Sequence, residues 1–185
     1  MSRKPFASDA GADPWGAMDA SRLRAFLGDA ARMWLAHDGL WFQAVEERFG
    51  TAAAIACDEQ AWARFSPIEA HRILERLDLA PGGGLEVLAL ALQHRLYSHL
   101  NPQVIERPAP GRLILRMQRC RVQEARRRKG LPDFPCKSVG QIEYSTFARA
   151  VDPRIDTRCR GCPPDPPQEG QACAWEFTLG EGVEA

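Results

Sequence analysis

Five of the six cysteines fall in the last 66 residues of the chain, and their spacing is typical of a metal site. Cys159 and Cys162 are separated by two residues, so both thiolates can turn toward one metal ion. Single cysteines flank this pair, since Cys136 precedes a predicted helix and Cys173 opens a predicted strand. We therefore expect these four thiolates to form one closed metal centre. Zinc is the expected metal, and a 4Fe-4S cluster with the same four ligands is the alternative.

Cys120 is left over from this site and is a candidate nucleophile. It lies between Arg119 and Arg121, at the predicted end of a strand and start of a basic helix. The helix dipole and the arginines would lower the pKa of its thiol. Glu124, one turn further, could move a proton or hold a ligand amine. The alternatives are that Cys120 fills core space, or that it replaces Cys136 as a metal ligand.

Aromatic residues predict a ligand pocket beside the cysteines. Trp34, His37 and Trp41 recur at spacings of three and four, which places them on one face of a helix. That face could meet the sheet around a pocket, with Tyr144 from a later helix as its fourth member. The alternative for His37 is a core histidine that bonds to its neighbours. Several tryptophans are expected to be exposed, which predicts a homodimer joined through the N-terminal helices: Trp34, Trp41 and Trp62.

The elements that must position these residues divide the chain into two halves. Residues 1–17 show no periodicity and are predicted to be a mobile arm, and residues 18–185 a single α+β domain. Residues 18–100 form its helical half, in which we expect helices over 19–49 with a break at 38–39, over 52–63, over 66–79 and over 85–100. The apolar helix at 52–63 places the sixth cysteine, Cys57, in the core.

Residues 101–180 are predicted to form the metal-binding α+β half. We expect a hairpin of strands over 103–106 and 112–119, helices over 122–129 and 139–151, and strands over 154–158 and 172–179. The fold class is thus α+β, with N-terminal helices packed on a small, mainly antiparallel sheet that carries two further helices.

Composition excludes several classes of function. Lys plus Arg (24) equals Asp plus Glu (24), and the eight basic residues of 112–129 are expected to form ion pairs or a solvated face, so nucleic-acid binding is not expected. No apolar stretch is long enough to span a membrane, and the first 15 residues contain no apolar run of the signal-peptide type, which predicts a reducing cytoplasm. Histidine-based zinc-protease, serine-hydrolase and phosphate-loop motifs are absent from the sequence.

Three families share parts of this pattern. Cys136, the helix with Gly140 and Tyr144, Cys159-x-x-Cys162 and Cys173-Ala-Trp-Glu-Phe resemble the four-vinyl-reductase-type small-molecule-binding domain, a relative of the TRAPP-component fold. This resemblance implies a TRAPP-like fold, a zinc site and dimers, with Cys159 standing where that family has Glu. The segment 120–124 with Lys129-Gly-Leu-Pro132 resembles the L-2-amino-thiazoline-4-carboxylic acid hydrolase-like proteins, with Arg121 in place of their proline. Residues 38–42 together with 120–177 most closely resemble an uncharacterised, cysteine-rich prokaryotic family.

The sequence therefore leaves two functions open. The first is a cytosolic, metal-containing protein that binds a small molecule in an aromatic-lined pocket beside four cysteines. The second is an iron-sulfur or thiol-dependent enzyme, hydrolase-like, that acts on a small sulfur- or nitrogen-containing substrate through Cys120 and Glu124. A closed four-thiolate centre leaves no free coordination position, which favours binding.

Overall fold

Two long helices open the fold. The structure is a computed structural model that describes residues 13–180, in which α1 spans Ala20–Phe49 and α2 spans Thr51–Arg76. Gly50 joins them in the left-handed region (φ 85°), where a glycine carries no steric penalty, and the chain reverses there. Asp19 begins α1 because its carboxylate accepts a hydrogen bond from the backbone N–H of Arg22 at 2.9 Å. Of the predicted arm, residues 1–12 lie outside the described residues.

Both long helices continue through breaks that the sequence predicted. α1 is unbroken at residues 38–39, because Trp34 and Phe42 on either side pack against the same apolar cluster. α2 is unbroken at Pro67, because its buried residues continue on both sides of the proline, from Trp62 to Leu74. In both helices the tertiary packing outweighs the local helix-breaking tendency.

The helix predicted over residues 85–100 is shorter than expected. α3 spans Gly84–Gln93 and is followed by a single 3-10 turn, η1, at Leu96–His99. Arg95 lies between them in an extended conformation (φ −66°, ψ 152°). The helix ends here because this conformation directs the Arg95 side chain into the interior, where it is 2% exposed.

The second half is the predicted antiparallel sheet with two helices. Its strands are β1 (Gln103–Ala109), β2 (Arg112–Met117), β3 (Ile155–Gly161) and β4 (Cys173–Leu179), in the order β1-β2-β4-β3. Its helices are α4 (Arg121–Arg128) and α5 (Lys137–Val151). β3 is longer than predicted and contains an irregularity between Cys159 and Gly161. The α+β class and the N-terminal position of the helices are confirmed.

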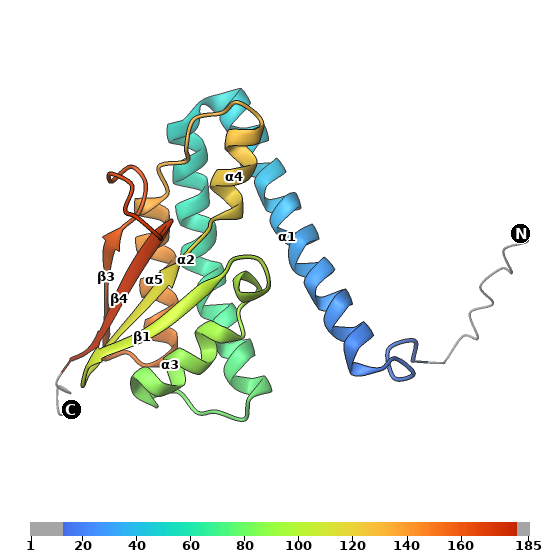
Figure 1. Ribbon diagram of the computed structural model, residues 1–185, viewed down its shortest axis with the longest axis vertical. Coiled ribbons are helices and arrows are strands. Elements are labelled where there is room, and N and C mark those ends of the chain that lie inside the picture. Colours follow the sequence, from blue (N-terminus) through green and yellow to red (C-terminus); the bar gives the residue numbers. More distant parts are fainter. Residues whose placement is uncertain (1–12, 181–185) are drawn as a thin grey trace, which may run out of the picture.

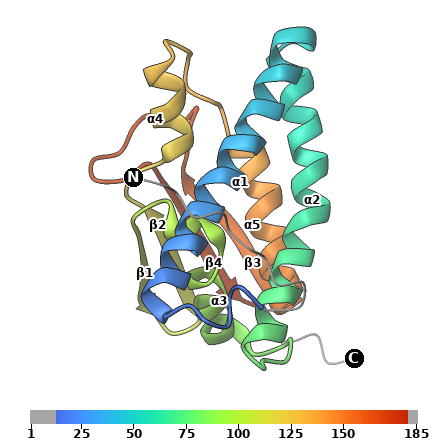
Figure 2. The same cartoon turned by 90° about the vertical axis from the view of Figure 1, so that its right-hand side faces the viewer.

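The elements are arranged in layers. α3 and α5 pack on the sheet, α2 packs on α5, and α1 packs on α2 (Figure 1; Figure 2). The main core lies between the sheet and α5, where Trp175 and Phe177 of β4 meet Phe147 of α5. A smaller cluster lies between the long helices and α4, around Trp62, Phe134 and Val139.

The N-terminal half of α1 is the least covered part of the fold. It extends away from the other helices (Figure 1), and its apolar side chains remain exposed: Leu23, Phe26, Leu27 and Met33. Trp15, within the predicted arm, packs edge-on against Phe26 with ring centroids 5.2 Å apart. This face of α1 is an apolar surface that the described part of the chain leaves open.

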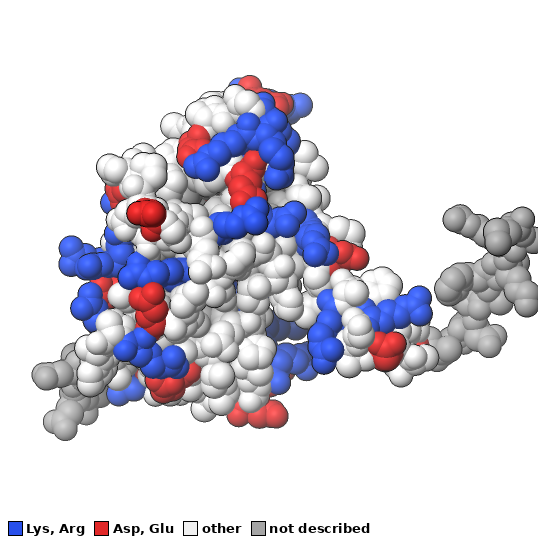
Figure 3. Space-filling model, in the orientation of Figure 1, with Lys and Arg blue, Asp and Glu red and all other residues white. Residues whose placement is uncertain are grey.

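The basic segment 112–129 is largely neutralised by ion pairs, as expected. Arg126 lies 2.8 Å from Glu46, Arg119 lies 2.8 Å from Glu124, and Arg127 lies 2.6 Å from Asp133. Acidic and basic side chains accordingly alternate around α4 (Figure 3). Among residues 13–180, no helix is long and apolar enough to cross a membrane.

Candidate functional site

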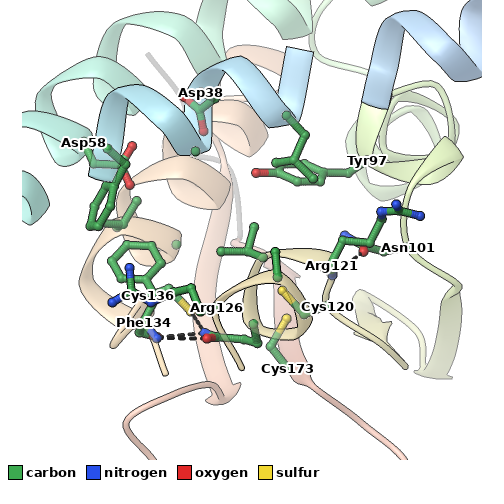
Figure 4. A pocket seen from close by; sticks show the side chains of 18 of the residues that line it. Asp38, Asp58, Tyr97, Asn101, Cys120, Arg121, Arg126, Phe134, Cys136 and Cys173 are labelled. Carbon is green, nitrogen blue, oxygen red and sulfur yellow. Dashed lines mark hydrogen bonds between the residues drawn. The ribbon is translucent and has the colours of Figure 1, made fainter. Parts of the chain in front are cut away.

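A cavity of about 420 Å³ lies where the two halves of the chain meet. The C-terminal half of α1, α2 and η1 form one side of it, and α4, α5 and the ends of β2 and β4 form the other (Figure 4). Its walls are mainly apolar, with Phe42, Trp62, Val122, Phe134 and Val139 among the lining side chains. We call this space the central cavity.

Three carboxyl groups line the central cavity. Asp38 comes from α1, Asp58 from α2 and Glu143 from α5. Burial, together with the nearby Asp38 and Glu143 carboxylates, raises the pKa of Asp58 to about 7. Burial likewise raises the pKa of Asp38, and raises that of Glu143 to about 7. The cavity thus holds three carboxyl groups with raised pKa values, and those of Asp58 and Glu143 lie near neutral pH.

Arg95 lies next to the cavity, behind a layer of aromatic rings. It forms ion pairs with Glu69 (2.8 Å) and Glu143 (2.7 Å). Its guanidinium carbon lies 5.4 Å from the ring centroid of Tyr97 and 5.3 Å from that of Tyr144, within cation–π distance. Both rings also line the central cavity, so each has contact with the buried cation and with the cavity.

The five C-terminal cysteines gather at this end of the sheet. Cys120, Cys136, Cys162 and Cys173 line the central cavity, whereas Cys159 does not. The thiols of Cys120 and Cys173 lie near each other on the side opposite Asp38 and Asp58 (Figure 4). Four of these five cysteines are thus brought to one cavity, from the end of β3, the start of β4 and the starts of α4 and α5.

Two of the predicted metal ligands are in direct contact. The sulfur atoms of Cys136 and Cys162 lie 3.2 Å apart, too far for a disulfide. A hydrogen bond from Cys162 lowers the pKa of the Cys159 thiol to about 7. Cys159 can reach Cys162 because the irregularity in β3 lies between them and interrupts the strict alternation of side chains. The predicted Cys-x-x-Cys pair is therefore part of a bulged strand end instead of a free turn.

The fourth predicted ligand, Cys173, is separate from these three. It begins β4, where it lies opposite Met117 of β2 and beside Cys120 (Figure 4). Among residues 13–180, no group of three or more His, Cys, Asp or Glu side chains is placed to hold a metal ion. The structure thus brings the four cysteines to one region without closing a tetrahedral site, and metal binding stays a prediction.

Cys120 differs from its predicted environment in two respects. It precedes α4 as expected, but β2 ends at Met117, so Cys120 is in the connection and not at the strand end. Burial raises the pKa of its thiol, in contrast to the expected low pKa. The arginine Arg119 does not counteract this, because it is paired with Glu124 at the surface. Glu124 does not line the central cavity.

Of the predicted pocket residues, the central cavity contains Tyr144 and not the other three. Trp34 packs edge-on against Trp62, with ring centroids 6.1 Å apart. His37 and Trp41 are exposed, because the face of α1 that carries them turns away from α2 and α4. Cys57 is also exposed, contrary to its expected place in the core.

The carboxyl groups and Arg95 were missed by reasoning from the sequence, although a signal was present. Glu143 shares the buried face of α5 with Gly140 and Phe147, at helical spacings of three and four. Asp58 precedes the buried Trp62 by four residues in the same way. A charged residue in register with an apolar helix face indicates a buried charge with a partner or a function.

Comparison with known proteins places the fold and the family. A trafficking protein particle complex subunit 3 from Naegleria fowleri, solved covalently bound to palmitic acid, shares the fold with a TM-score of 0.51. Its sequence is 10% identical, and the match covers 88% of this chain and 99% of that chain. No curated protein matches the chain in sequence. Residues 17–179 match the sequence pattern of DUF6125, and the chain therefore belongs to this family of unknown function.

Proposed function

We propose that this protein binds a small, mainly apolar molecule in the central cavity. The observation that carries the proposal is the cavity itself, whose volume of about 420 Å³ lies in the usual range for ligand pockets. Its lining is mainly apolar and aromatic, with a few polar groups that could orient a ligand. Both halves of the chain contribute to the walls, as is common for ligand sites between packed layers.

The solved neighbour supports an apolar ligand. That protein has the same fold and is covalently bound to palmitic acid, a long apolar chain. In the present chain, the interior between the long helices and the sheet end is likewise lined by aromatic and aliphatic side chains. Assembly with a second copy through the open face of α1 is part of the proposal, because burying that face would remove exposed apolar surface from water.

The hydrolase-like alternative has less support than binding. A nucleophilic cysteine needs a thiolate, and burial raises the pKa of Cys120. Glu124 is engaged by Arg119 at 2.8 Å and lies outside the central cavity. Among the residues that the structure describes, no histidine lines the cavity to act as the base. Zinc at the cysteines, or a 4Fe-4S cluster as the alternative, is a separate proposal on which ligand binding does not depend.

The test is a titration with two neutral apolar probes, octan-1-ol and 2-phenylethanol. Trp62 and Trp175 line the cavity, so binding should change the intrinsic fluorescence in a saturable way and raise the melting temperature. Ala125→Phe, a substitution in the cavity wall on α4, should weaken binding of both probes by about tenfold or more.

The matched control is Ala63→Phe, the same substitution at an exposed position of α2 that does not line the cavity. This variant should bind both probes as the unmodified protein does. The proposal fails if neither probe binds saturably, or if Ala125→Phe folds and binds as tightly as Ala63→Phe.

A further inference from the structure

The charges around the central cavity are not balanced. Arg95 already has two carboxylates, Glu69 at 2.8 Å and Glu143 at 2.7 Å. Asp38 and Asp58 line the same cavity, and neither forms an ion pair with a residue that the structure describes. Two carboxyl groups of the cavity, both on the wall formed by α1 and α2, are therefore without an ion-pair partner among residues 13–180.

Two tyrosines from different elements, Tyr97 of η1 and Tyr144 of α5, add unused hydrogen-bonding groups to the cavity. Tyr144 is 5% exposed and lines the cavity, and its hydroxyl makes no hydrogen bond within residues 13–180. The Tyr97 hydroxyl is directed into the cavity (Figure 4) and likewise has no partner in the described part of the chain. Both residues line the cavity, so their hydroxyls are available to a polar group of a ligand.

The aromatic rings favour a positive charge at the same place. One side of Trp62, Tyr97 and Tyr144 already accommodates the Arg95 guanidinium, at 5.3 to 5.7 Å from the ring centroids. All three residues also line the cavity. Aromatic rings beside carboxylates are the usual surroundings of ammonium groups, which gain both Coulomb and cation–π energy there.

We propose that the ligand of the central cavity is an organic cation, with a protonated amine between Asp38, Asp58 and the tyrosine hydroxyls and an apolar body directed toward the cysteines. This inference rests on the proposed function and names the ligand class. Among the described residues, the carboxyl groups are not placed to hold a metal ion, which favours an ammonium group over a bare metal.

The basic residues near the cavity do not oppose this assignment. Arg126 is paired with Glu46 through both of its terminal nitrogens, at 2.8 and 3.0 Å. Arg32 is paired with Asp29 at 2.7 Å and is half exposed. Arg121, Arg128 and Lys129 are exposed at the rim, where water screens their charge. The Lys129 ammonium also donates a hydrogen bond to the Gln43 side-chain oxygen at 2.8 Å. The experiment must therefore distinguish a cationic ligand in the cavity from an anionic ligand held by these basic residues at the rim.

The experiment compares three probes of equal chain length: octylamine, octan-1-ol and octanoate. Titrations are carried out by calorimetry at pH 8, above the pKa of Asp58, where the amine is protonated. We expect octylamine to bind about tenfold or more tightly than octan-1-ol, and octanoate to bind most weakly. Asp58→Asn should remove most of the preference for the amine and leave octan-1-ol affinity within about twofold.

Glu47→Gln is the matched control, because Glu47 is an exposed carboxylate of α1 that does not line the cavity. It changes the net charge by the same amount and should retain the full amine preference. Binding of octan-1-ol without any preference for octylamine overturns the cation inference alone, as does tighter binding of octanoate. An amine preference that survives in the double variant Asp38→Asn/Asp58→Asn also overturns it. Failure of all three probes to bind overturns the proposed function as well.

Discussion

Gly140 on α5 is a position where one methyl group should measurably weaken the fold. A Cβ atom built there would lie 2.5 Å from Cζ2 and 2.9 Å from Cη2 of Trp175, well below the 3.4 Å at which ordinary contacts begin. The indole cannot easily yield, because Trp175 is 1% exposed and stacks on Tyr144 with ring centroids 4.8 Å apart. Gly140→Ala therefore requires α5 or the indole to move by roughly 1 Å, which disturbs the stacking of Trp175 on Tyr144.

Two opposing effects set the size of the change. Overpacking a core typically costs about 1–3 kcal/mol. Replacing a helical glycine by alanine gains about 0.5–1 kcal/mol through the unfolded chain and helix propensity. We expect Gly140→Ala to lower the free energy of unfolding by about 1–2 kcal/mol, measured by urea denaturation with circular dichroism.

Gly39 on α1 supplies the matched control. A Cβ atom there meets nothing within 4 Å, so Gly39→Ala should keep the helix-propensity gain and raise the free energy of unfolding by about 0.5–1 kcal/mol. The double variant Gly140→Ala/Trp175→Phe should be less destabilised than the two single effects predict together, because the smaller ring leaves room for the methyl group. A Gly140→Ala protein as stable as Gly39→Ala would refute the close-packing argument.

Three further predictions concern charge, metal and assembly. The pKa of Asp58 is raised from 3.8 to about 7 by its burial and by its acidic neighbours: Asp38, Glu143 and Glu59. An ionised Asp58 carboxylate therefore destabilises the folded state fully above about pH 7 and has no effect below about pH 4. Asp58→Asn should accordingly raise the free energy of unfolding at pH 8 by at most about 4 kcal/mol and change it little at pH 4, as measured by denaturant titration at each pH. Elemental analysis and absorption spectra of anaerobically purified protein should show one zinc ion, or one brown 4Fe-4S cluster, per chain. If the Cys162→Ser variant retains the full metal content, Cys162 is not a ligand. Light scattering should give about twice the chain mass of 20.6 kDa. Trp41→Ser should shift the measured mass toward that of the monomer, because Trp41 is 64% exposed on α1. A wild-type mass near that of one chain would rule out the dimer.

The sequence predicted the fold class and most elements because their periodicities are strong. The hairpin, α4, α5 and the final strand lie close to their expected places, since alternating residues such as Trp175 and Phe177 define a buried strand face. The helix boundaries at residues 38–39, 66–67 and 93–100 were wrong because packing partners, which are distant in sequence, decide them. Trp34 and Arg95 illustrate this, as each meets residues from another element.

The candidate site could be predicted only in part. The cysteines were identified by their residue type, and the structure brings four of them to the central cavity. Their contacts were not predictable, because a bulge in β3 decides which side Cys159 occupies. Asp38 and Asp58 gave no pattern by themselves, and their proximity follows from the crossing of α1 and α2.

Arg95 also determines how the two halves of the chain can behave. Its guanidinium joins Glu69 of α2 to Glu143 of α5, and its 2% exposure means that separating the halves would uncover a buried charge and strip it of Glu143. Removing one member of such a buried pair typically costs about 3–5 kcal/mol. The connection around residue 95 is therefore a rigid joint, and the halves should unfold together in one cooperative step instead of moving as independent modules.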